Sequence, residues 1–353
     1  MGKEGKIKVL IVDDSLFFRE FLAKGISEDP FLEVVAKATD PFDARDKILE
    51  YEPDVMTCDV EMPKMNGIEF VKRLLSQYLM PVIIVSSIGD AAFEAMKIGA
   101  IEFVSKPDTR SPESVDKFIS DMIYKLKVAA KSKVIVRNIE ESKYEPPGTT
   151  GMDSKVTGDA GDAGDDSKII AIGASTGGTE AIYSILKQLP TRVPGILIVQ
   201  HIPPMFSKLF VERMNGQLKL QVKEAENGDF VGPGKVFVAP GDQHMRIKKL
   251  GDKYKINLFQ GEKRNGHCPS VDVLFESVAS VCKENSIGII LTGMGYDGVK
   301  GLMAMRRRGA KTIGQDEETS VVYGMPKAAF ELGAVERQIP LDKIPQTLVK
   351  MLK

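Results

Sequence analysis

Three residues with reactive side chains lie at or just beyond the ends of apolar stretches in this 353-residue sequence. They are Ser175, His201 and Asp297. If the apolar stretches are parallel strands, their carboxyl ends share one edge of a sheet and the three side chains meet there. A hydroxyl, an imidazole and a carboxylate in contact supply a nucleophile, a general base and a group that orients the base. We therefore expect hydrolytic chemistry of the Ser-His-Asp type.

The serine lies in a glycine-rich turn between a predicted strand and a predicted helix. Residues 173–177 read Gly-Ala-Ser-Thr-Gly, which fits the nucleophile-elbow pattern, with the hydroxyl beside backbone N–H groups at a helix start. A serine that caps a helix, or a glycine loop beneath a nucleotide phosphate, would give a similar pattern. The nucleotide interpretation is disfavoured because no lysine follows the glycines and Gln200, not an acidic residue, ends the second strand. The order Ser, His, Asp also differs from that of α/β-hydrolases.

A second set of polar residues follows the strands predicted in the N-terminal third of the chain. Asp13, Asp14, Asp59, Ser86 and Lys106 all come at the ends of apolar runs. Parallel strands would bring these side chains to one edge. Three carboxylates suit a hard divalent cation such as Mg²⁺, the ammonium offsets phosphate charge, and the hydroxyl can bond to a phosphate oxygen. This edge is a predicted site for a cation and a phosphoryl group.

Hydrophobic periodicity predicts the elements that position both sets. Strands alternate with amphipathic helices up to about residue 130, which indicates a five-stranded parallel sheet with helices on both faces. Apolar runs near 169–174, 194–200, 234–239 and 287–292 indicate a second α/β domain with a mostly parallel sheet. The turn at Gly251-Asp252 predicts a β-hairpin over 245–259, where we expect this second sheet to become mixed.

Two other groups of polar residues have simpler interpretations. Asp242 and His244 could both bind a metal, but without a third ligand a structural turn is the better interpretation. Ser270 precedes a helical pattern and could be its N-cap.

Composition narrows the possible classes of function. Lys+Arg 48 against Asp+Glu 49 gives a net charge of -1, so no basic excess favours nucleic acid or anionic lipid. Cys58, Cys268 and Cys282 contain no Cys-x-x-Cys pair, which suits a reducing compartment and offers no zinc site. Neither a membrane-spanning apolar run nor a signal-peptide core is present, so we expect a cytoplasmic protein.

Residues 131–166 differ in composition from both flanking regions. The helical apolar pattern fades from about residue 131, and the glycine- and aspartate-rich run 158–166 has almost nothing apolar to bury, which is typical of a flexible linker. Such a chain has a root-mean-square span on the order of 30 Å, so the N-terminal domain could dock on its neighbour or leave it. The predicted domains are therefore 1–130 and 167–353, with the linker 131–166 between them.

Residues 7–126 resemble a response-regulator receiver domain, because the polar set described above stands where this family has its phosphorylation site. The resemblance implies a flavodoxin-like fold, phosphorylation of Asp59 by a partner histidine kinase, and a Mg²⁺ ion held by Asp13, Asp14 and Asp59. It assigns the switch residues to Ser86, Phe103 and Lys106. A core aromatic accounts for Phe103 equally well.

From residue 167 onward the chain resembles the catalytic domain of chemotaxis protein-glutamate methylesterases. Six ordered segments carry this resemblance: 173–178, 200–204, 239–245, 269–275, 291–298 and 321–326. It implies hydrolysis of glutamate γ-methyl esters on chemoreceptors, with release of methanol, and deamidation of particular receptor glutamines. It assigns the triad to Ser175, His201 and Asp297 and an oxyanion-binding N–H to Met294. It implies no cofactor for the ester reaction.

Together the two resemblances imply a hydrolase controlled by phosphorylation. Phosphate on Asp59 adds about −1.5 to −2 charges and would shift a docking equilibrium that covers or frees Ser175. The alternative is a response regulator whose second domain binds a receptor or ligand without catalysis. A transcriptional output is more distant, because no helix-turn-helix with a basic face is present.

Overall fold

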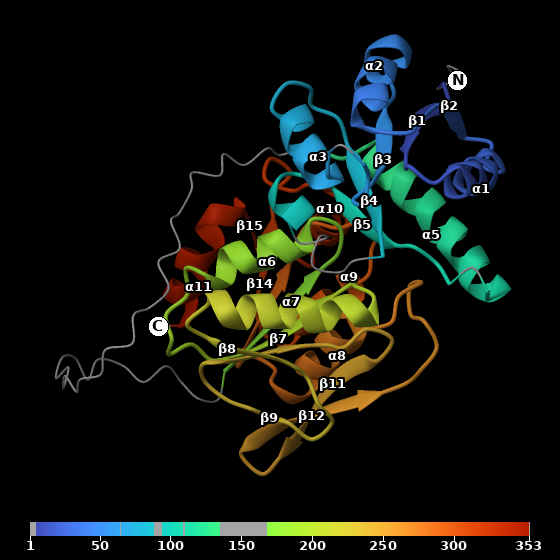
Figure 1. The fold of residues 1–353 in the computed structure, drawn as a ribbon. Coiled ribbons are helices and arrows are strands. Elements are labelled where there is room, and N and C mark those ends of the chain that lie inside the picture. The colour runs from blue at the N-terminus through green and yellow to red at the C-terminus, as the bar shows by residue number, and fades with distance from the viewer. Residues whose placement is uncertain (1–4, 64, 88–93, 109, 135–167, 353) are drawn as a thin grey trace, which may run out of the picture.

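The computed structural model describes residues 5–63, 65–87, 94–108, 110–134 and 168–352. They form two α/β domains that lie against each other, the first in blue to green and the second in yellow-green to red in Figure 1. The predicted domain boundaries are compatible with these elements, since α5 ends at Ala129 and the next strand begins at Ile169. Most of the predicted linker, residues 135–166, lies outside the described residues.

The N-terminal domain contains the predicted five-stranded parallel sheet, and its strand order is β2-β1-β3-β4-β5. Its strands are β1 (Ile7–Val12), β2 (Leu32–Ala38), β3 (Val55–Asp59), β4 (Val82–Ser86) and β5 (Glu102–Ser105). Its described helices are α1 (Leu16–Ser27), α2 (Pro41–Tyr51), α3 (Gly67–Leu75) and α5 (Pro112–Ala129).

Alternating side chains of the strands explain why helices cover both faces of this sheet. In β1, Leu10 and Val12 pack with α2 and α3, while Val9 and Ile11 pack with α1 and α5 on the other face. All four are buried, as expected for a central parallel strand. The strands therefore point their carboxyl ends, with the polar residues that follow, at one edge.

The C-terminal domain has a seven-stranded sheet with strand order β15-β14-β13-β6-β7-β10-β8. Its strands are β6 (Ile169–Ala174), β7 (Gly195–Gln200), β8 (Gln221–Glu224), β10 (Lys235–Val238), β13 (Ser286–Ile290), β14 (Lys311–Gln315) and β15 (Arg337–Ile339). The helices α6 (Gly178–Leu186), α7 (Pro204–Gln217) and α11 (Ile344–Leu352) pack on one face. The other face is covered by α8 (Val271–Val281), α9 (Val299–Arg307) and α10 (Met325–Glu331). A short 3₁₀ helix, η1 (Leu341–Lys343), precedes α11.

The expectation that this sheet becomes mixed is wrong, because every strand pair in it is parallel. The predicted hairpin does form, from β11 (His244–Leu250) and β12 (Lys253–Phe259), but it joins β9 (Phe230–Val231) in a separate antiparallel sheet. Its apolar face packs against α8, where Ile247 N–H donates to Ser277 Oγ (3.1 Å). The hairpin thus buries its apolar side against a helix and needs no edge of the parallel sheet.

The two domains are in contact through apolar side chains and backbone. The ring of Phe103 on β5 meets that of Phe206 on α7 edge to face, with centroids 4.5 Å apart. After α5, the backbone N–H of Lys133 donates to the carbonyl oxygen of Val321 (3.0 Å). One continuous cluster of buried apolar side chains runs through both domains. Over the described residues, no helix combines the length and apolar character needed to cross a bilayer.

Candidate active site

The three residues at the predicted catalytic edge follow neighbouring strands. Strands β13, β6 and β7 are adjacent in the sheet, and all three are parallel. Ser175 follows β6 directly, His201 follows β7 directly, and Asp297 lies seven positions after the end of β13. The backbone N–H of His201 donates to the carbonyl oxygen of Ala174 (3.1 Å), which fixes the two strand ends against each other.

His201 and Asp297 are in direct contact. The Nε2 atom of His201 lies 2.9 Å from Oδ2 of Asp297, and both side chains are almost fully buried. Because a carboxylate only accepts hydrogen bonds, Nε2 carries the hydrogen and the Nδ1 atom of the neutral ring keeps its lone pair. The contact therefore fixes the tautomer that a general base needs, with Nδ1 as the basic atom.

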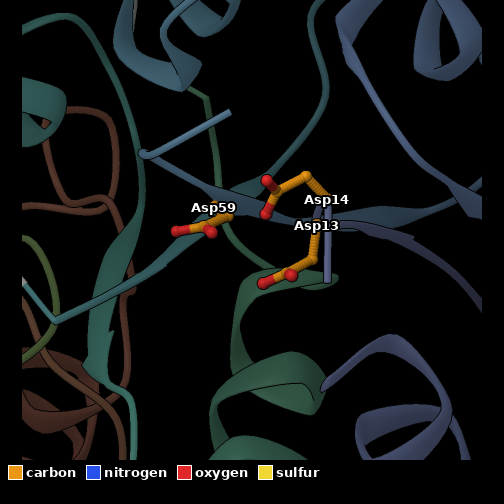
Figure 2. Close-up of side chains that lie close together, drawn as sticks. All are labelled: Asp13, Asp14 and Asp59. Atoms are coloured by element: carbon orange, nitrogen blue, oxygen red, sulfur yellow. The ribbon is translucent and has the colours of Figure 1, made fainter. Parts of the chain in front are cut away.

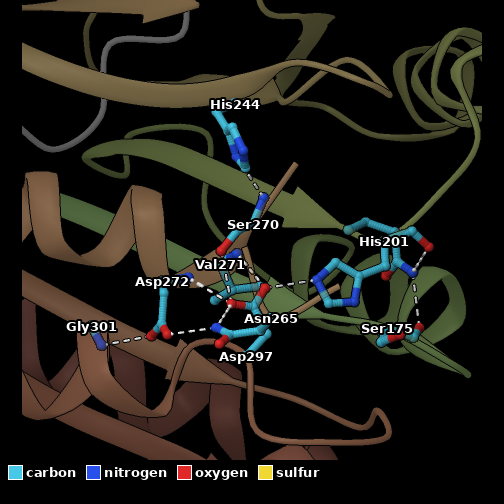
Figure 3. A network of polar contacts seen from close by, with 10 residues as sticks. Ser175, His201, His244, Asn265, Ser270, Val271, Asp272, Asp297 and Gly301 are labelled. Atoms are coloured by element: carbon cyan, nitrogen blue, oxygen red, sulfur yellow. Dashed lines mark hydrogen bonds and ion pairs between the residues drawn. The ribbon is translucent and has the colours of Figure 1, made fainter. Parts of the chain in front are cut away.

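The carboxylate of Asp297 is held at the N-terminus of α8, as Figure 3 shows. Oδ2 accepts from the backbone N–H of Val271 (2.7 Å), and Oδ1 accepts from Ser270 Oγ (2.8 Å) and Asn265 Nδ2 (2.8 Å). Burial raises the pKa of Asp297, but the hydrogen bonds from His201, Asn265 and Ser270 outweigh it and hold the pKa well below its usual range. Asp297 is thus a fixed anion.

Asn265 and Asp272 extend this network, and the sequence patterns did not identify either of them as functional. The side-chain amide of Asn265 donates to both Asp297 and Asp272, at 2.8 Å each. Asp272 is fully buried, and its carboxylate also accepts from the backbone N–H of Gly301 at the start of α9 (2.7 Å). The network links the loop before α8 to the starts of two helices. Asp272 lies within one of the motif segments, but a loop asparagine gives no comparable signal.

His244 has structural partners, as its simpler interpretation predicted, whereas Ser270 meets its predicted N-cap role only in position. Nδ1 of His244 accepts from the backbone N–H of Ser270 (3.2 Å), and Nε2 lies 2.9 Å from the carbonyl oxygen of Glu262. Both ring nitrogens are therefore used, and neither can bind a metal in this conformation. Ser270 does occupy the N-cap position of α8, but its hydroxyl bonds to Asp297 and not to the helix backbone.

Gln200, the last residue of β7, connects the turn that carries Ser175 to the backbone of His201. Its Nε2 atom donates to the carbonyl oxygens of Ser175 (2.8 Å) and His201 (3.1 Å). A Cβ atom on Gly178 would lie 2.1 Å from Oε1 of Gln200, so only glycine fits at the first position of α6. The backbone N–H of Gly178 in turn donates to the Ser175 carbonyl (2.7 Å). The turn is consequently held by both neighbouring elements.

Ser175 and His201 line one pocket, together with residues of the N-terminal domain. The pocket residues from that domain are Met96, Glu102, Phe103 and Lys125. Among the described residues, the buried Nδ1 atom of His201 has no hydrogen-bond partner, so the bond from Ser175 Oγ is not made in this conformation. Such bonds often form only when substrate is bound. The structure thus brings all three residues to one site but joins only His201 and Asp297.

The loop that follows β13 passes close to Ser175. A Cβ atom on Gly293 would lie 2.6 Å from Cβ of Ser175, so this close approach requires glycine. The backbone N–H of Ser175 donates to the carbonyl oxygen of Thr292 (3.0 Å) and is not available to an oxyanion. The N–H of Met294, two residues after Thr292, makes no hydrogen bond to the described residues. The predicted oxyanion donor, Met294, thus keeps its N–H free of a backbone partner in the described structure.

The predicted phosphorylation site forms at the carboxyl edge of the first sheet (Figure 2). Asp13, Asp14 and Asp59 each offer a carboxylate oxygen, and these atoms lie within 4.8 Å of one another. Lys106 Nζ lies 2.8 Å from Asp13 Oδ2 and 2.7 Å from Asp59 Oδ2. Burial raises the pKa of Asp59, and Asp13 adds to this, whereas Lys106 opposes it. Three oxygen donors at this spacing fit a hard divalent cation.

Of the predicted switch residues, Lys106 belongs to this site, whereas Phe103 lies at the contact with the catalytic domain. Ser86 ends β4 and is fully buried, and its carbonyl oxygen accepts from the backbone N–H of Lys106 (3.1 Å). Phe103 is buried against Phe206, which follows His201 by five residues. Phe103 is therefore an aromatic of the interface between the domains as well as of the receiver-side core.

Comparisons with known proteins match both halves of the chain. The family model described as CheB methylesterase matches residues 170–348, and that described as response regulator receiver domain matches residues 9–115. A protein-glutamate methylesterase/protein-glutamine glutaminase 2 of Syntrophomonas wolfei is 52% identical, over 98% of each chain. One from Sulfurimonas denitrificans is 44% identical, again over 98% of each chain.

A solved structure resembles the C-terminal domain. The crystal structure of the Thermotoga maritima CheB methylesterase catalytic domain is 40% identical, with a TM-score of 0.51. The matched region covers 52% of this chain and 98% of the Thermotoga maritima chain.

Proposed function

The chain belongs to the CheB methylesterase family, and on that basis we propose that it hydrolyses glutamate γ-methyl esters on chemoreceptors, releases methanol, and deamidates particular receptor glutamines. The observation that carries the proposal is the 2.9 Å contact between His201 and Asp297 beside Ser175, on three adjacent strand ends. Relatives that match along nearly the whole chain carry both activities in their names.

In the proposed reaction, Ser175 Oγ attacks the carbonyl carbon of the ester while His201 Nδ1 takes its proton. Asp297 stabilises the imidazolium that forms, and the backbone N–H of Met294 donates to the oxyanion. The intermediate collapses when His201 gives the proton to the leaving oxygen, and methanol departs. Water, deprotonated by His201, then hydrolyses the acyl-serine and leaves the glutamate carboxylate. With glutamine as substrate, ammonia is the leaving group.

The receiver domain supplies the proposed control of this reaction. A partner histidine kinase would transfer a phosphoryl group to Asp59. Asp13, Asp14 and Asp59 are the residues that would hold a Mg²⁺ ion, whose charge would offset that of the phosphoryl oxygens. Lys106 already bridges Asp13 and Asp59, so a phosphoryl group on Asp59 would draw its ammonium into a new ion pair. Because Phe103 lies two residues before the end of β5, movement there would reach the contact with Phe206. We propose that phosphorylation weakens this contact and opens the pocket of Ser175.

The direct test is methanol release from methylated receptor membranes, with and without a phosphodonor. Ser175→Ala is expected to abolish release, while Ser184→Ala on α6 serves as a matched serine control and is expected to keep it. Full activity in the Ser175→Ala protein would reject the assignment of the nucleophile.

The rival function is a response regulator whose second domain only binds its receptor or ligand. A serine-directed phosphonate distinguishes the two, because labelling at Ser175 requires an activated hydroxyl. Absence of both labelling and methanol release in the phosphorylated protein would favour the binding function.

A further inference from the structure

A second histidine lies flat against His201. The rings of His267 and His201 are stacked with centroids 3.7 Å apart and planes only 9° from parallel. Asp297 contacts the edge of the His201 ring, and His267 covers one of its faces. The ring is thus contacted from two directions. The proposed mechanism gives His267 no part, although it is the nearest aromatic neighbour of the base among the described residues.

The loop that carries His267 is held by backbone hydrogen bonds, by an ion pair and by a side-chain hydrogen bond. The backbones of Arg264 and His267 exchange two hydrogen bonds of 3.0 Å each, which closes a tight reversal. The guanidinium of Arg264 forms an ion pair with Glu276 on α8. Asn265, in the left-handed region with φ of 53°, donates to Asp297. The loop that positions His267 therefore also supplies, through Asn265, one of the hydrogen bonds that hold the Asp297 carboxylate.

Hydrogen bonding within the described structure does not explain why a histidine stands at position 267. Its ring nitrogens make no hydrogen bond to the described residues, whereas both nitrogens of His244 are used. The only ring partner of His267 in the described structure is His201. A histidine chosen for structure alone would be expected to resemble His244 in its bonding.

We propose that His267 is a positioning residue for the esterase reaction, whose neutral π-face holds the His201 ring and stabilises the imidazolium that forms during catalysis. This inference rests on the proposed function. A cation against an aromatic face is attracted by the ring quadrupole, and the face also excludes water from one side of the base. A cation at position 267 would do the opposite.

The charge state of His267 fits this role. Burial lowers its pKa to about 4, with His201 and Lys263 acting in the same direction and Asp297 opposing them. These are the ionisable groups that face the ring from the ends of β7 and β13 and from its own loop. His267 is therefore neutral near pH 7.

The test compares His267→Phe with His267→Leu in the full-length protein, assayed on methylated receptor membranes with a phosphodonor. Both variants place an apolar side chain at this partly buried position, but only phenylalanine keeps an aromatic face. We expect the Phe variant to keep kcat within about threefold and the Leu variant to lose kcat by roughly 3- to 30-fold, with KM nearly unchanged. In the Leu variant the acidic limb of the pH profile of kcat/KM should move to lower pH, because the imidazolium of His201 is less stabilised.

A direct readout avoids the assay altogether. The sequence contains only three histidines, so a ¹⁵N-histidine spectrum can follow the titration of His201 in each variant. His201 should titrate at lower pH in the Leu variant than in the Phe variant. His267→Met provides a second non-aromatic side chain if the Leu variant does not fold, with phosphorylation of Asp59 from acetyl phosphate as a check on the rest of the molecule.

Two results would overturn the inference. One is a Leu or Met variant that matches the Phe variant in kcat and in the titration of His201. The other is a Phe variant as impaired as the Leu variant, which would mean that the imidazole itself is needed. An inactive wild-type protein that behaves like Ser175→Ala would instead reject the proposed function, and this inference with it.

Discussion

Asp297 owes its fixed charge to four different partners. It accepts hydrogen bonds from the ring of His201, the amide of Asn265, the hydroxyl of Ser270 and the start of α8. Every one of these groups is a donor, so the site accepts a carboxylate and disfavours any side chain that must itself donate. Asp297 therefore both orients His201 and connects the loop before α8 to the start of that helix.

Replacing this carboxylate by an amide should remove most of the activity. We expect Asp297→Asn to lower kcat by about 10³–10⁴-fold, because the amide no longer fixes the tautomer of His201 or balances the imidazolium. Methanol release under saturating phosphodonor measures the effect. Asp252→Asn at the exposed hairpin turn is the control and should retain wild-type activity. A loss of less than tenfold at Asp297 would contradict the role proposed for it.

The low pKa of His267 predicts how stability depends on pH. The unfolded chain binds a proton at this residue near pH 6.5, whereas the folded chain binds it only near pH 4. The free energy of unfolding therefore falls as pH drops from about 6.5 to 4, by up to roughly 3 kcal/mol from this group.

The comparison of wild type with His267→Phe isolates that contribution. Urea unfolding at several pH values should show a shallower acid destabilisation of the C-terminal domain in the variant. Parallel curves for the two proteins would show that His267 titrates alike in the folded and unfolded states.

At the level of elements, the turn between β6 and α6 depends on the strand beside it. Gln200 on β7 bonds to the carbonyls of Ser175 and His201, and Gly178 leaves the space that its side chain occupies. The geometry of the nucleophile is thus set by a neighbouring strand as well as by its own turn.

Gly178→Ala tests this dependence. The added methyl group would also lie 2.6 Å from Cβ of Ala174, so Gln200 and the turn must move. We expect kcat to fall at least tenfold. Gly216→Ala on α7 is the matched control, since its Cβ meets nothing within 4 Å and should stabilise the helix by roughly 0.5–1 kcal/mol. Wild-type activity in Gly178→Ala would show that the bonds of Gln200 are not needed.

The patterns of the sequence predicted the elements well where apolar periodicity was regular. Strand ends could be located from runs such as 169–174 and 287–292, and with them the neighbourhood of Ser175, His201 and Asp297. The loop that carries Asn265 and His267 could not be predicted, because its course depends on a left-handed residue and on an ion pair with α8. Neither feature has a periodic signal. The β11–β12 hairpin was predicted, but its place in a separate sheet with β9 was not. That place depends on packing of the hairpin against α8, which has no signal in the local sequence.

At the scale of the whole molecule, the pocket of Ser175 is shared between the domains. Phe103 packs on Phe206, and Lys133 bonds to Val321, whose side chain lies against Gly177 next to the nucleophile. The docked receiver, through Phe103, and the start of the linker, through Lys133, therefore contact the catalytic domain at two places near Ser175.

Loosening the aromatic contact should raise the activity of the unphosphorylated protein. We expect Phe103→Ala to increase methanol release without phosphodonor several-fold and to shrink the further increase on adding it, because part of the contact is already lost. Phe42→Ala, at an exposed phenylalanine on α2, is the control. If Phe103→Ala left basal release unchanged or lower, the receiver would not restrain Ser175 through this contact.

The shared pocket also limits how such proteins can be recombined. A receiver transplanted from a relative would bring its own residues to positions 96, 102, 103 and 125, and these would become part of the wall around a foreign nucleophile. Chimaeras should therefore lose regulation unless the partner of residue 103 on α7 is exchanged with it. We expect residues of the two domains that meet at this interface to have been substituted together during evolution. Residues away from the interface are expected to have changed independently.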